Sequence, residues 1–270
     1  MCSGVTFELI PALDIPHAVL AFCAAFLAGA INSIAGGGTL VSFPTLIWLG
    51  LPSVMANATS TVAIWPASIS SMFGYRKEMS TASTRMLLLV FPSLTGGIVG
   101  ALLLRWTPPG IFDALVPFLI LFATLLFMAQ EVIQRKFKTE NAMAHASPRW
   151  MAGAVLFQLL VAIYGGYFGA GIGILMLAAL SILGLTDIHQ MNGLKNFFGG
   201  CINGVAAFYF IWARMVYWPF VVIMAAGAIA GGYGGAGLAR RLGRTAVRRI
   251  VVAIGFGMAL SLFIKFLSKN

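Results

Sequence analysis

The stretch AINSIAGGGTLVSFPTLIWLGLP, residues 30–52, decides the fold class. It has no charged residue, and three consecutive glycines, Gly36–Gly38, stand in the middle of what would otherwise be one apolar helix. Glycine interrupts a helix at little steric cost. The apolar run after the glycines, 39–50, is too short to cross about 30 Å of hydrocarbon at about 1.5 Å per residue. The stretch therefore predicts a broken helix and a half-helix within a membrane.

Composition extends this prediction to the whole chain. Hydrophobic residues make up 60% of the 270 positions and charged residues 9%, and the mean hydropathy is +0.96. No Lys, Arg, Asp or Glu lies between Asp14 and Arg76 or between Arg149 and Asp187, and each run is too long for one membrane crossing. We predict an all-α integral membrane protein whose helical segments lie near residues 16–35, 39–50, 53–75, 86–105, 111–131, 149–168, 172–184, 188–212, 216–239 and 247–267.

A second stretch, GGYFGAGIGILMLAALSILGL at 165–185, repeats the order of the first. A glycine cluster precedes a short apolar run at 172–184, and the Leu-Gly-Leu turn recurs 134 residues after its first copy. This similarity predicts a first transmembrane repeat at 1–133, a cytoplasmic linker at 134–148 and a second transmembrane repeat at 149–270. Each repeat would hold about five helical segments, one of them a short or re-entrant half-helix.

The basic residues predict how the repeats are oriented. They gather in three loops, 76–85, 135–149 and 240–249, which the positive-inside rule places in the cytoplasm. Three basic loops share one face only if each repeat crosses the membrane an odd number of times. The two repeats would then have inverted topology, as in many transporters, with the N-terminus outside. The net charge of +10 thus indicates orientation and no nucleic-acid partner.

The glycine clusters indicate where a substrate would bind. Each cluster precedes the start of a short helix, where backbone N–H groups are free and the helix dipole is positive. Anions bind at such termini, and discontinuous helices of transporters use them in this way. The alternative is that the glycines only allow helices to pack closely.

Polar residues follow each predicted half-helix inside apolar sequence, and Asn192, Asn196 and Asn203 have the spacing of one helix face. Interhelical hydrogen bonding is the alternative for each amide or hydroxyl. Lys195 is the one charge expected inside the bundle, and its alternative is to extend to the nearby loop at 185–189. The predicted substrate-binding residues are Asn32, Gly36, Gly37, Gly38, Thr39, Asn57, Thr59, Ser60, Gly169, Gly171, Gly173, Asn192, Lys195 and Asn196.

The sequence carries no pattern typical of an enzyme or a metalloprotein. Its three histidines are far apart, and its three cysteines are scattered without ligand spacing. Asp113 and Asp187 lie near predicted helix ends, so no buried carboxylate pair is available for acid–base chemistry. We therefore expect no catalytic residues, no metal and no cofactor.

The assembled motifs resemble the sulfite exporter TauE/SafE family, also called the toluenesulfonate uptake permease family. The resemblance rests in the first half on Ala28-Gly29, Ile34–Gly38, Pro44, Leu49–Pro52 and Ala58-Thr59-Ser60. In the second half it rests on Gly169–Gly173 and Met191–Asn196. The resemblance covers most of the chain outside the N-terminal tail and the central linker. Thr39 departs from it, because the family commonly has glycine or a hydrophobic residue there; the hydroxyl would contact substrate or cap the half-helix.

This resemblance implies a permease of the bacterial inner membrane for small anions such as sulfite or organosulfonates. We expect a multi-pass transporter whose half-helices and polar residues bind an oxyanion between them, with alternating movement of the two halves. Its partners would be the anion and the lipid bilayer, and a homo-oligomer is left open. The alternative is a membrane-embedded assembly or interaction protein that uses the glycines only for packing. A cation carrier is disfavoured, because no acidic residue is evident at membrane depth.

Overall fold

The computed structural model describes residues 14–34, 36–74, 84–136, 148–183, 185, 187–242 and 244–267, and these residues form helices and connecting turns without strands. The helices of the first half are α1 (Ile15–Ile34), α2 (Thr39–Trp48), α3 (Ser53–Gly74), η2 (Thr84–Leu89, a 3-10 helix), α5 (Val90–Trp106) and α6 (Pro109–Lys136). Those of the second half are α7 (Pro148–Tyr167), α8 (Ile172–Ile182), α9 (Ile188–Trp212), α10 (Trp218–Leu242) and α11 (Arg244–Leu267).

The all-helical prediction is confirmed, and most predicted segments coincide with a helix of the structure. One difference precedes α5, where a 3-10 helix occupies the start of the predicted segment. Pro92 explains it, because proline has no N–H and its ring clashes with the carbonyl four residues earlier. A second difference is α6, which continues to Lys136 and so enters the linker predicted at 134–148. The charged residues at the end of α6 mark the edge of the apolar segment, but they do not end the helix.

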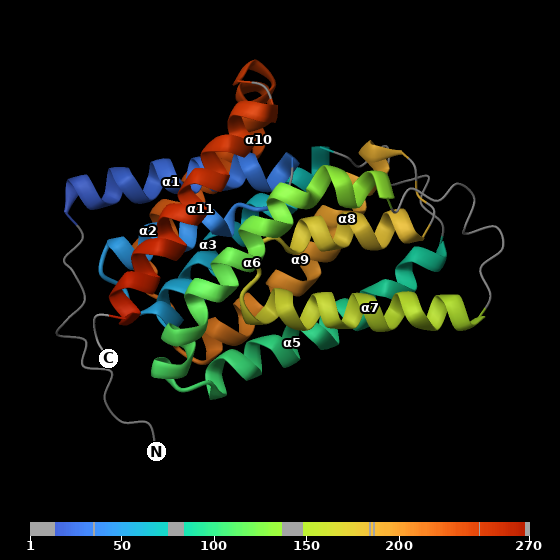
Figure 1. Ribbon diagram of the computed structural model, residues 1–270, viewed down its shortest axis with the longest axis horizontal. Coiled ribbons are helices and arrows are strands. Elements are labelled where there is room, and N and C mark those ends of the chain that lie inside the picture. Colours follow the sequence, from blue (N-terminus) through green and yellow to red (C-terminus); the bar gives the residue numbers. More distant parts are fainter. Residues whose placement is uncertain are drawn as a thin grey trace.

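Helices from one half of the chain pack against helices from the other half. Along its outside, α1 packs on α10 and α5 packs on α7, while α3 and α9 pack together in the centre (Figure 1). The half-helices α2 and α8 lie against α1 and α7 respectively. In Figure 1, α1 begins at the left edge and α7 at the right edge, so these two helices run in opposite directions.

The outer helix pairs are joined backbone to backbone through glycines. A Cβ atom built on Gly231 of α10 would lie 1.9 Å from the Phe26 oxygen of α1. On the other pair, a Cβ on Gly166 of α7 would lie 2.2 Å from the Gly97 oxygen of α5. Larger side chains are excluded at these crossings, as at close helix contacts in membranes. Each pair therefore fastens the first half of the chain to the second.

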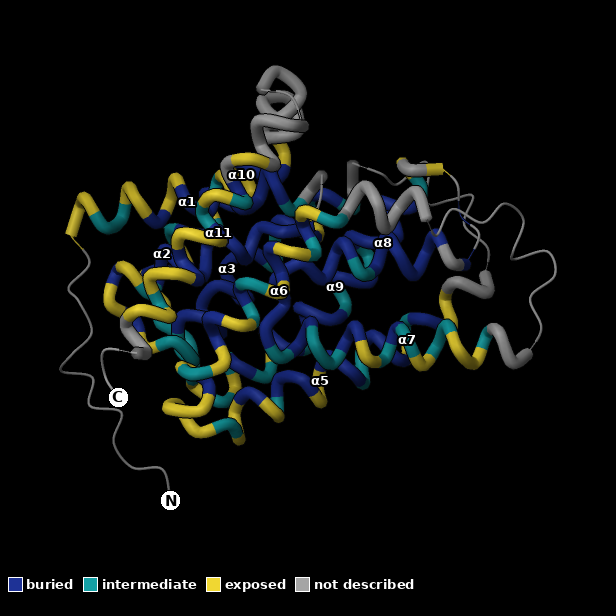
Figure 2. The backbone as a smooth tube through the Cα atoms, in the orientation of Figure 1, coloured by how far each residue is buried: buried dark blue, intermediate teal, exposed yellow. Residues whose placement is uncertain are grey.

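The outer surface is apolar enough to face lipid. Three helical segments are long and apolar enough to cross a membrane, judged by length and composition over the described residues: Ile15–Asn32, Leu87–Trp106 and Pro109–Ala129. Buried residues fill the centre along α2, α3 and α9, and exposed ones follow the outer helices (Figure 2). Many exposed side chains are large and hydrophobic, among them Phe91, Phe118, Leu160, Val222 and Leu260. A soluble surface rarely gathers so much apolar area.

Part of the sequence prediction falls outside the described residues. The loop at 76–85 is described only from residue 84, and the linker is not described at 137–147. Of the basic side chains in the three predicted cytoplasmic loops, only that of Arg249 is described, and it is exposed. The sidedness of these loops stays a prediction.

Candidate anion site at two helix breaks

The two breaks begin in the same way, although their N-caps differ, with φ −58° at Gly38 and +76° at Gly171. After α1, Gly36 adopts φ +78° and its N–H donates to the Ile31 oxygen at 3.2 Å. After α7, Gly169 adopts φ +78° and its N–H donates to the backbone carbonyl oxygen of Tyr164, also at 3.2 Å. A left-handed residue at this point turns the chain out of the helix, and glycine adopts that conformation without Cβ strain. Each helix thus ends at a glycine, and a new helix begins three residues later.

The half-helices also end alike. The Leu51 N–H donates to the Leu46 oxygen at 3.0 Å, and the Leu185 N–H donates to the Leu180 oxygen at 3.1 Å. Both bonds span five residues at the predicted Leu-Gly-Leu turns, and Gly50 has a positive φ of 89°. This pattern is that of a Schellman cap. It stops α2 after 10 residues and α8 after 11, so both helices are too short to span a bilayer.

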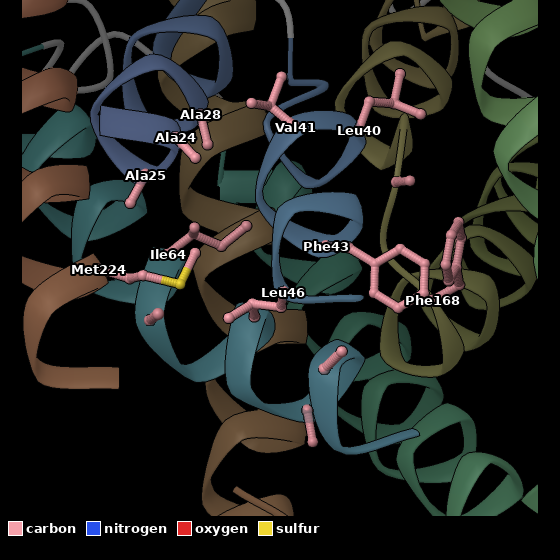
Figure 3. Close-up of a cluster of buried hydrophobic side chains, with 14 of the residues drawn as sticks. Ala24, Ala25, Ala28, Leu40, Val41, Phe43, Leu46, Ile64, Phe168 and Met224 are labelled. Atoms are coloured by element: carbon pink, nitrogen blue, oxygen red, sulfur yellow. The ribbon is translucent and has the colours of Figure 1, made fainter. Parts of the chain in front are cut away.

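The two breaks meet in space. A Cβ atom on Gly36 would lie 2.5 Å from the Cα of Gly173, the second residue of α8. Side chains also connect the two regions, because Phe43 of α2 packs edge-on against Phe168 of the second break, with ring centroids 5.2 Å apart (Figure 3). Residues more than 120 positions apart in the chain therefore form one site, which the sequence alone could not place together.

Backbone donors remain free at both half-helix starts. Gly38 and Gly171 are the N-caps, and within the described residues their N–H groups have no acceptor, nor does that of Gly173. Packing explains some of these glycines, since a Cβ on Gly38 would lie 2.3 Å from the Ala28 oxygen. Gly171 has another structural reason, because a Cβ would meet only ordinary contacts at 3.6 Å but the residue has φ +76°, which glycine adopts without strain. Packing and backbone conformation therefore account for different glycines of the clusters.

The α3 side of the site consists of Asn57 and Ser60, both fully buried. The Asn57 side-chain nitrogen donates to the backbone carbonyl oxygen of Tyr167, at the end of α7, at 2.9 Å, while its side-chain oxygen is buried without a partner among the described residues. The Ser60 hydroxyl is 2.7 Å from that of Ser42 in α2. α3 thus connects the first half-helix to the second break.

Three predicted residues differ from the expectation in their geometry. Thr59 points to the opposite side of α3 from Asn57, where its hydroxyl accepts a hydrogen bond from the Tyr217 N–H at 3.0 Å. Thr39 is the first residue of α2, and Gly38, not Thr39, is the N-cap. Gly37 lies at the first break but faces Phe127, whose ring would be 2.8 Å from an added Cβ. The contacts of Thr59 and Gly37 therefore lie outside the polar cluster.

The α9 side of the site is a continuous polar face. Asn192, Lys195, Asn196 and Asn203 are all buried, at helical spacing. The Asn192 amide oxygen and the Asn196 amide nitrogen have no hydrogen-bond partner among the described residues. Buried polar atoms are nearly always paired, so an unpaired set marks a place where a water, ion or ligand is expected.

Open space adjoins this face at Gly199, between Asn196 and Asn203. Gly199 is buried, yet no heavy atom outside its own helix backbone and chain neighbours lies within 4 Å of a Cβ built on it. Most buried glycines of the described helices would place a Cβ against a neighbour. Sequence reasoning missed Gly199, although its position between two asparagines of the same face was a usable signal.

Lys195 is the centre of the electrostatics. Lys195 is 3% exposed, so its side chain does not extend to the membrane surface. Its ammonium group donates to the backbone carbonyl oxygen of Asn32 in α1 at 3.2 Å. The side-chain amide nitrogen of Asn32 donates to the Ser68 hydroxyl at 3.3 Å. Lys195 is the only charged side chain that is buried among the described residues, and Asp14, Asp113 and Asp187 are all exposed. A buried ammonium without a carboxylate is costly unless an anion joins it.

The fold and site define a class of protein: a multi-pass helical membrane protein with a polar centre between broken helices. A family model for the sulfite exporter TauE/SafE matches residues 21–262. The chain therefore belongs to the sulfite exporter TauE/SafE family.

Relatives agree with this assignment over nearly their whole length. A protein of Haemophilus influenzae is 30% identical over 242 residues, which cover 88% of this chain and 91% of the relative. A Sinorhizobium protein, ORF9, is 26% identical over 89% of this chain and 90% of its own. YfcA of Escherichia coli K12 is 24% identical over 89% of this chain and 87% of its own. All three are named "probable membrane transporter protein", and this chain is a membrane transporter for a small molecule.

Proposed function

We propose that the transporter carries a small anion, sulfite or an organosulfonate, at the place where the two breaks meet. The observation that carries this proposal is Lys195, a buried ammonium with no buried carboxylate among the described residues. Burying a lone charge costs several kcal/mol by general experience with proteins. Binding an anion beside it offsets that cost, whereas binding a cation would increase it.

Neutral donors complete the proposed site. The free N–H groups of Gly38, Gly171 and Gly173 and the unpaired amide of Asn196 supply hydrogen bonds from both halves of the chain. A sulfonate or sulfite group has three oxygens, and it can accept bonds from several directions at once. The open space beside Gly199 would hold the group that the sulfur carries. The family name supports the sulfur chemistry, because it describes a sulfite exporter.

We also infer that the two halves are inverted repeats. Three features support this: the two breaks begin alike at Gly36 and Gly169, α1 and α7 run in opposite directions in Figure 1, and the α1–α10 contact has its counterpart in α7–α5. The basic loops at 76–85, 135–149 and 240–249 would face the cytoplasm of a bacterium, across its inner membrane.

The moving parts for alternating access follow from the glycine crossings. Because α1 is fastened to α10 and α5 to α7, the first half of the chain is not free to move as a unit against the second. We propose instead that one body contains α1 with α10, the other contains α5 with α7, and the site lies between them. Inverted-repeat transporters commonly switch access by such rocking about a fixed site.

Transport of labelled anion by the purified protein in liposomes tests the proposal, with Lys195→Met as the decisive variant. Methionine approximates the length of lysine without the charge, and removing an unpaired buried charge is neutral or stabilising. We expect uptake of labelled sulfite or methanesulfonate to fall at least about 100-fold, while thermal stability is kept or raised. Arg105→Met, at the exposed end of α5, is the matched control and should transport normally.

Two results would count against an anion transporter. The first is no saturable flux of any anion in a broad panel by the wild-type protein. The second is wild-type flux by Lys195→Met. The alternative, a membrane assembly or interaction protein, predicts that substituting Lys195 leaves the function of the chain intact and that no solvated central cavity exists.

A further inference from the structure

The helix ends at the two breaks carry partial charges of both signs. At the first break the C-terminus of α1 is followed by the N-terminus of α2, and at the second the C-terminus of α7 is followed by the N-terminus of α8. A helix end carries roughly half an elementary charge, positive at the N-terminus and negative at the C-terminus. Two positive and two negative ends within a few residues of one another largely cancel. The half-helices alone therefore do not make the site positive, although they supply directed donors.

The side chains around the breaks leave one full charge. Asn57, Asn192, Asn196 and Ser60 are neutral, and the three acidic side chains that the structure describes are exposed. Lys195 contributes one positive charge, and its ammonium group donates to a neutral acceptor, the backbone carbonyl oxygen of Asn32. The net charge of the site, as far as the described residues define it, is thus one positive unit.

We propose that this site selects anions with a single negative charge over dianions of the same size and shape. The inference rests on the proposed anion transport and adds the substrate's charge to it. A monoanion makes the occupied site neutral, whereas a dianion leaves one negative charge buried without a counter-ion. Such an uncompensated charge is far more costly than the loss of one hydrogen bond. Sulfonates and hydrogen sulfite meet the requirement, and sulfate does not.

The two halves differ at the position that would supply a second charge. Ser60 is the eighth residue of α3 and Lys195 the eighth residue of α9, and the fifth residue is asparagine in both, Asn57 and Asn192. In the first half this position bears a hydroxyl that bonds Ser42. The site therefore has two corresponding positions and only one cation. Ser60→Lys would add the second positive charge that a bound dianion needs as its counter-ion.

Competition between isosteric anions tests the proposal on the wild-type protein. Methanesulfonate and sulfate are both tetrahedral at sulfur and differ by a methyl group in place of a charged oxygen. At one fixed pH, each unlabelled anion competes with labelled methanesulfonate for uptake into proteoliposomes. We expect sulfate to inhibit at least about tenfold more weakly than methanesulfonate. Ser60→Lys should narrow that difference, and Lys195→Arg, which keeps the charge, should preserve it.

The outcomes separate this inference from the proposed function. Saturable anion uptake with equal inhibition by sulfate and methanesulfonate overturns charge selection and leaves anion transport standing. Charge selection is also overturned if sulfate and methanesulfonate inhibit uptake by Lys195→Arg equally well. Absence of any anion uptake refutes the proposed function itself. The wild-type comparison decides the question even if Ser60→Lys does not fold.

Discussion

The contact between Gly36 and Gly173 makes a quantitative prediction. In Gly36→Ala the new methyl group would stand 2.5 Å from the Gly173 Cα and 3.1 Å from its nitrogen, where van der Waals contact needs well over 3 Å. Both atoms belong to backbone, so no side chain can rotate away. The two helix breaks would have to separate, and the whole polar centre would be disturbed with them.

Two costs contribute to the expected loss of stability. Placing a Cβ at a left-handed φ of +78° costs about 1 kcal/mol. Forcing an extra methyl group into a packed interior costs about 1–3 kcal/mol. We therefore expect Gly36→Ala to lose about 2–4 kcal/mol, which corresponds to a fall of very roughly 5–10 °C in the unfolding temperature by the scaling of large domains.

Thermal unfolding of the purified protein in detergent, followed by tryptophan fluorescence, measures this loss. The matched control is Gly257→Ala in α11, where nothing lies within 4 Å of the added methyl group. Alanine in an open helix position is neutral or stabilising by up to about 1 kcal/mol. An unfolding temperature for Gly36→Ala as high as that of Gly257→Ala would refute the argument that the two breaks are in rigid contact.

Three further predictions concern the site and its frame. Gly199→Val fills the open space on the α9 face and should reduce anion uptake about tenfold or more without loss of stability. The control Gly200→Val, on a neighbouring face that is also open, should transport nearly normally, and equal uptake by both variants would show that substrate does not use the space at Gly199. Thr59→Val removes a buried hydrogen-bond acceptor and should cost about 1–3 kcal/mol in unfolding experiments with an unchanged KM, so a raised KM would return this residue to the binding site. Gly166→Leu should prevent folding because its Cβ would overlap α5, while Gly153→Leu in the same helix has open space; similar yields of folded protein would contradict the close α5–α7 crossing.

Local sequence carries much of the fold because membrane helices leave strong local signals. Apolar runs must form helices in lipid, since backbone groups find no water to bond there. The glycine clusters before the short runs therefore predicted both breaks, which the structure places at Gly36 and Gly169. The length of α6 was harder to predict, because charged residues such as Glu131 and Arg135 end the apolar segment while remaining good helix formers.

The site was predictable in its parts and not in its assembly. Asn57, Asn192 and Asn196 were expected as polar groups at membrane depth, and all three are buried with one amide atom that has no partner among the described residues. Thr59 belonged to the same motif, yet its hydroxyl bonds the turn before α10. Periodicity separates the faces of a helix, but it does not say which face meets the centre.

The paired glycine breaks, the half-helices and the single internal lysine are properties that the sequence by itself determined, because each depends on neighbouring residues in a medium without water. Only the tertiary structure decided that the breaks touch, that Lys195 reaches α1 and lacks a buried acidic partner among the described residues, and that glycine crossings fasten each half to the other. These contacts join residues from opposite halves of the chain. They depend on which helix faces pack together, and local propensity does not specify that choice.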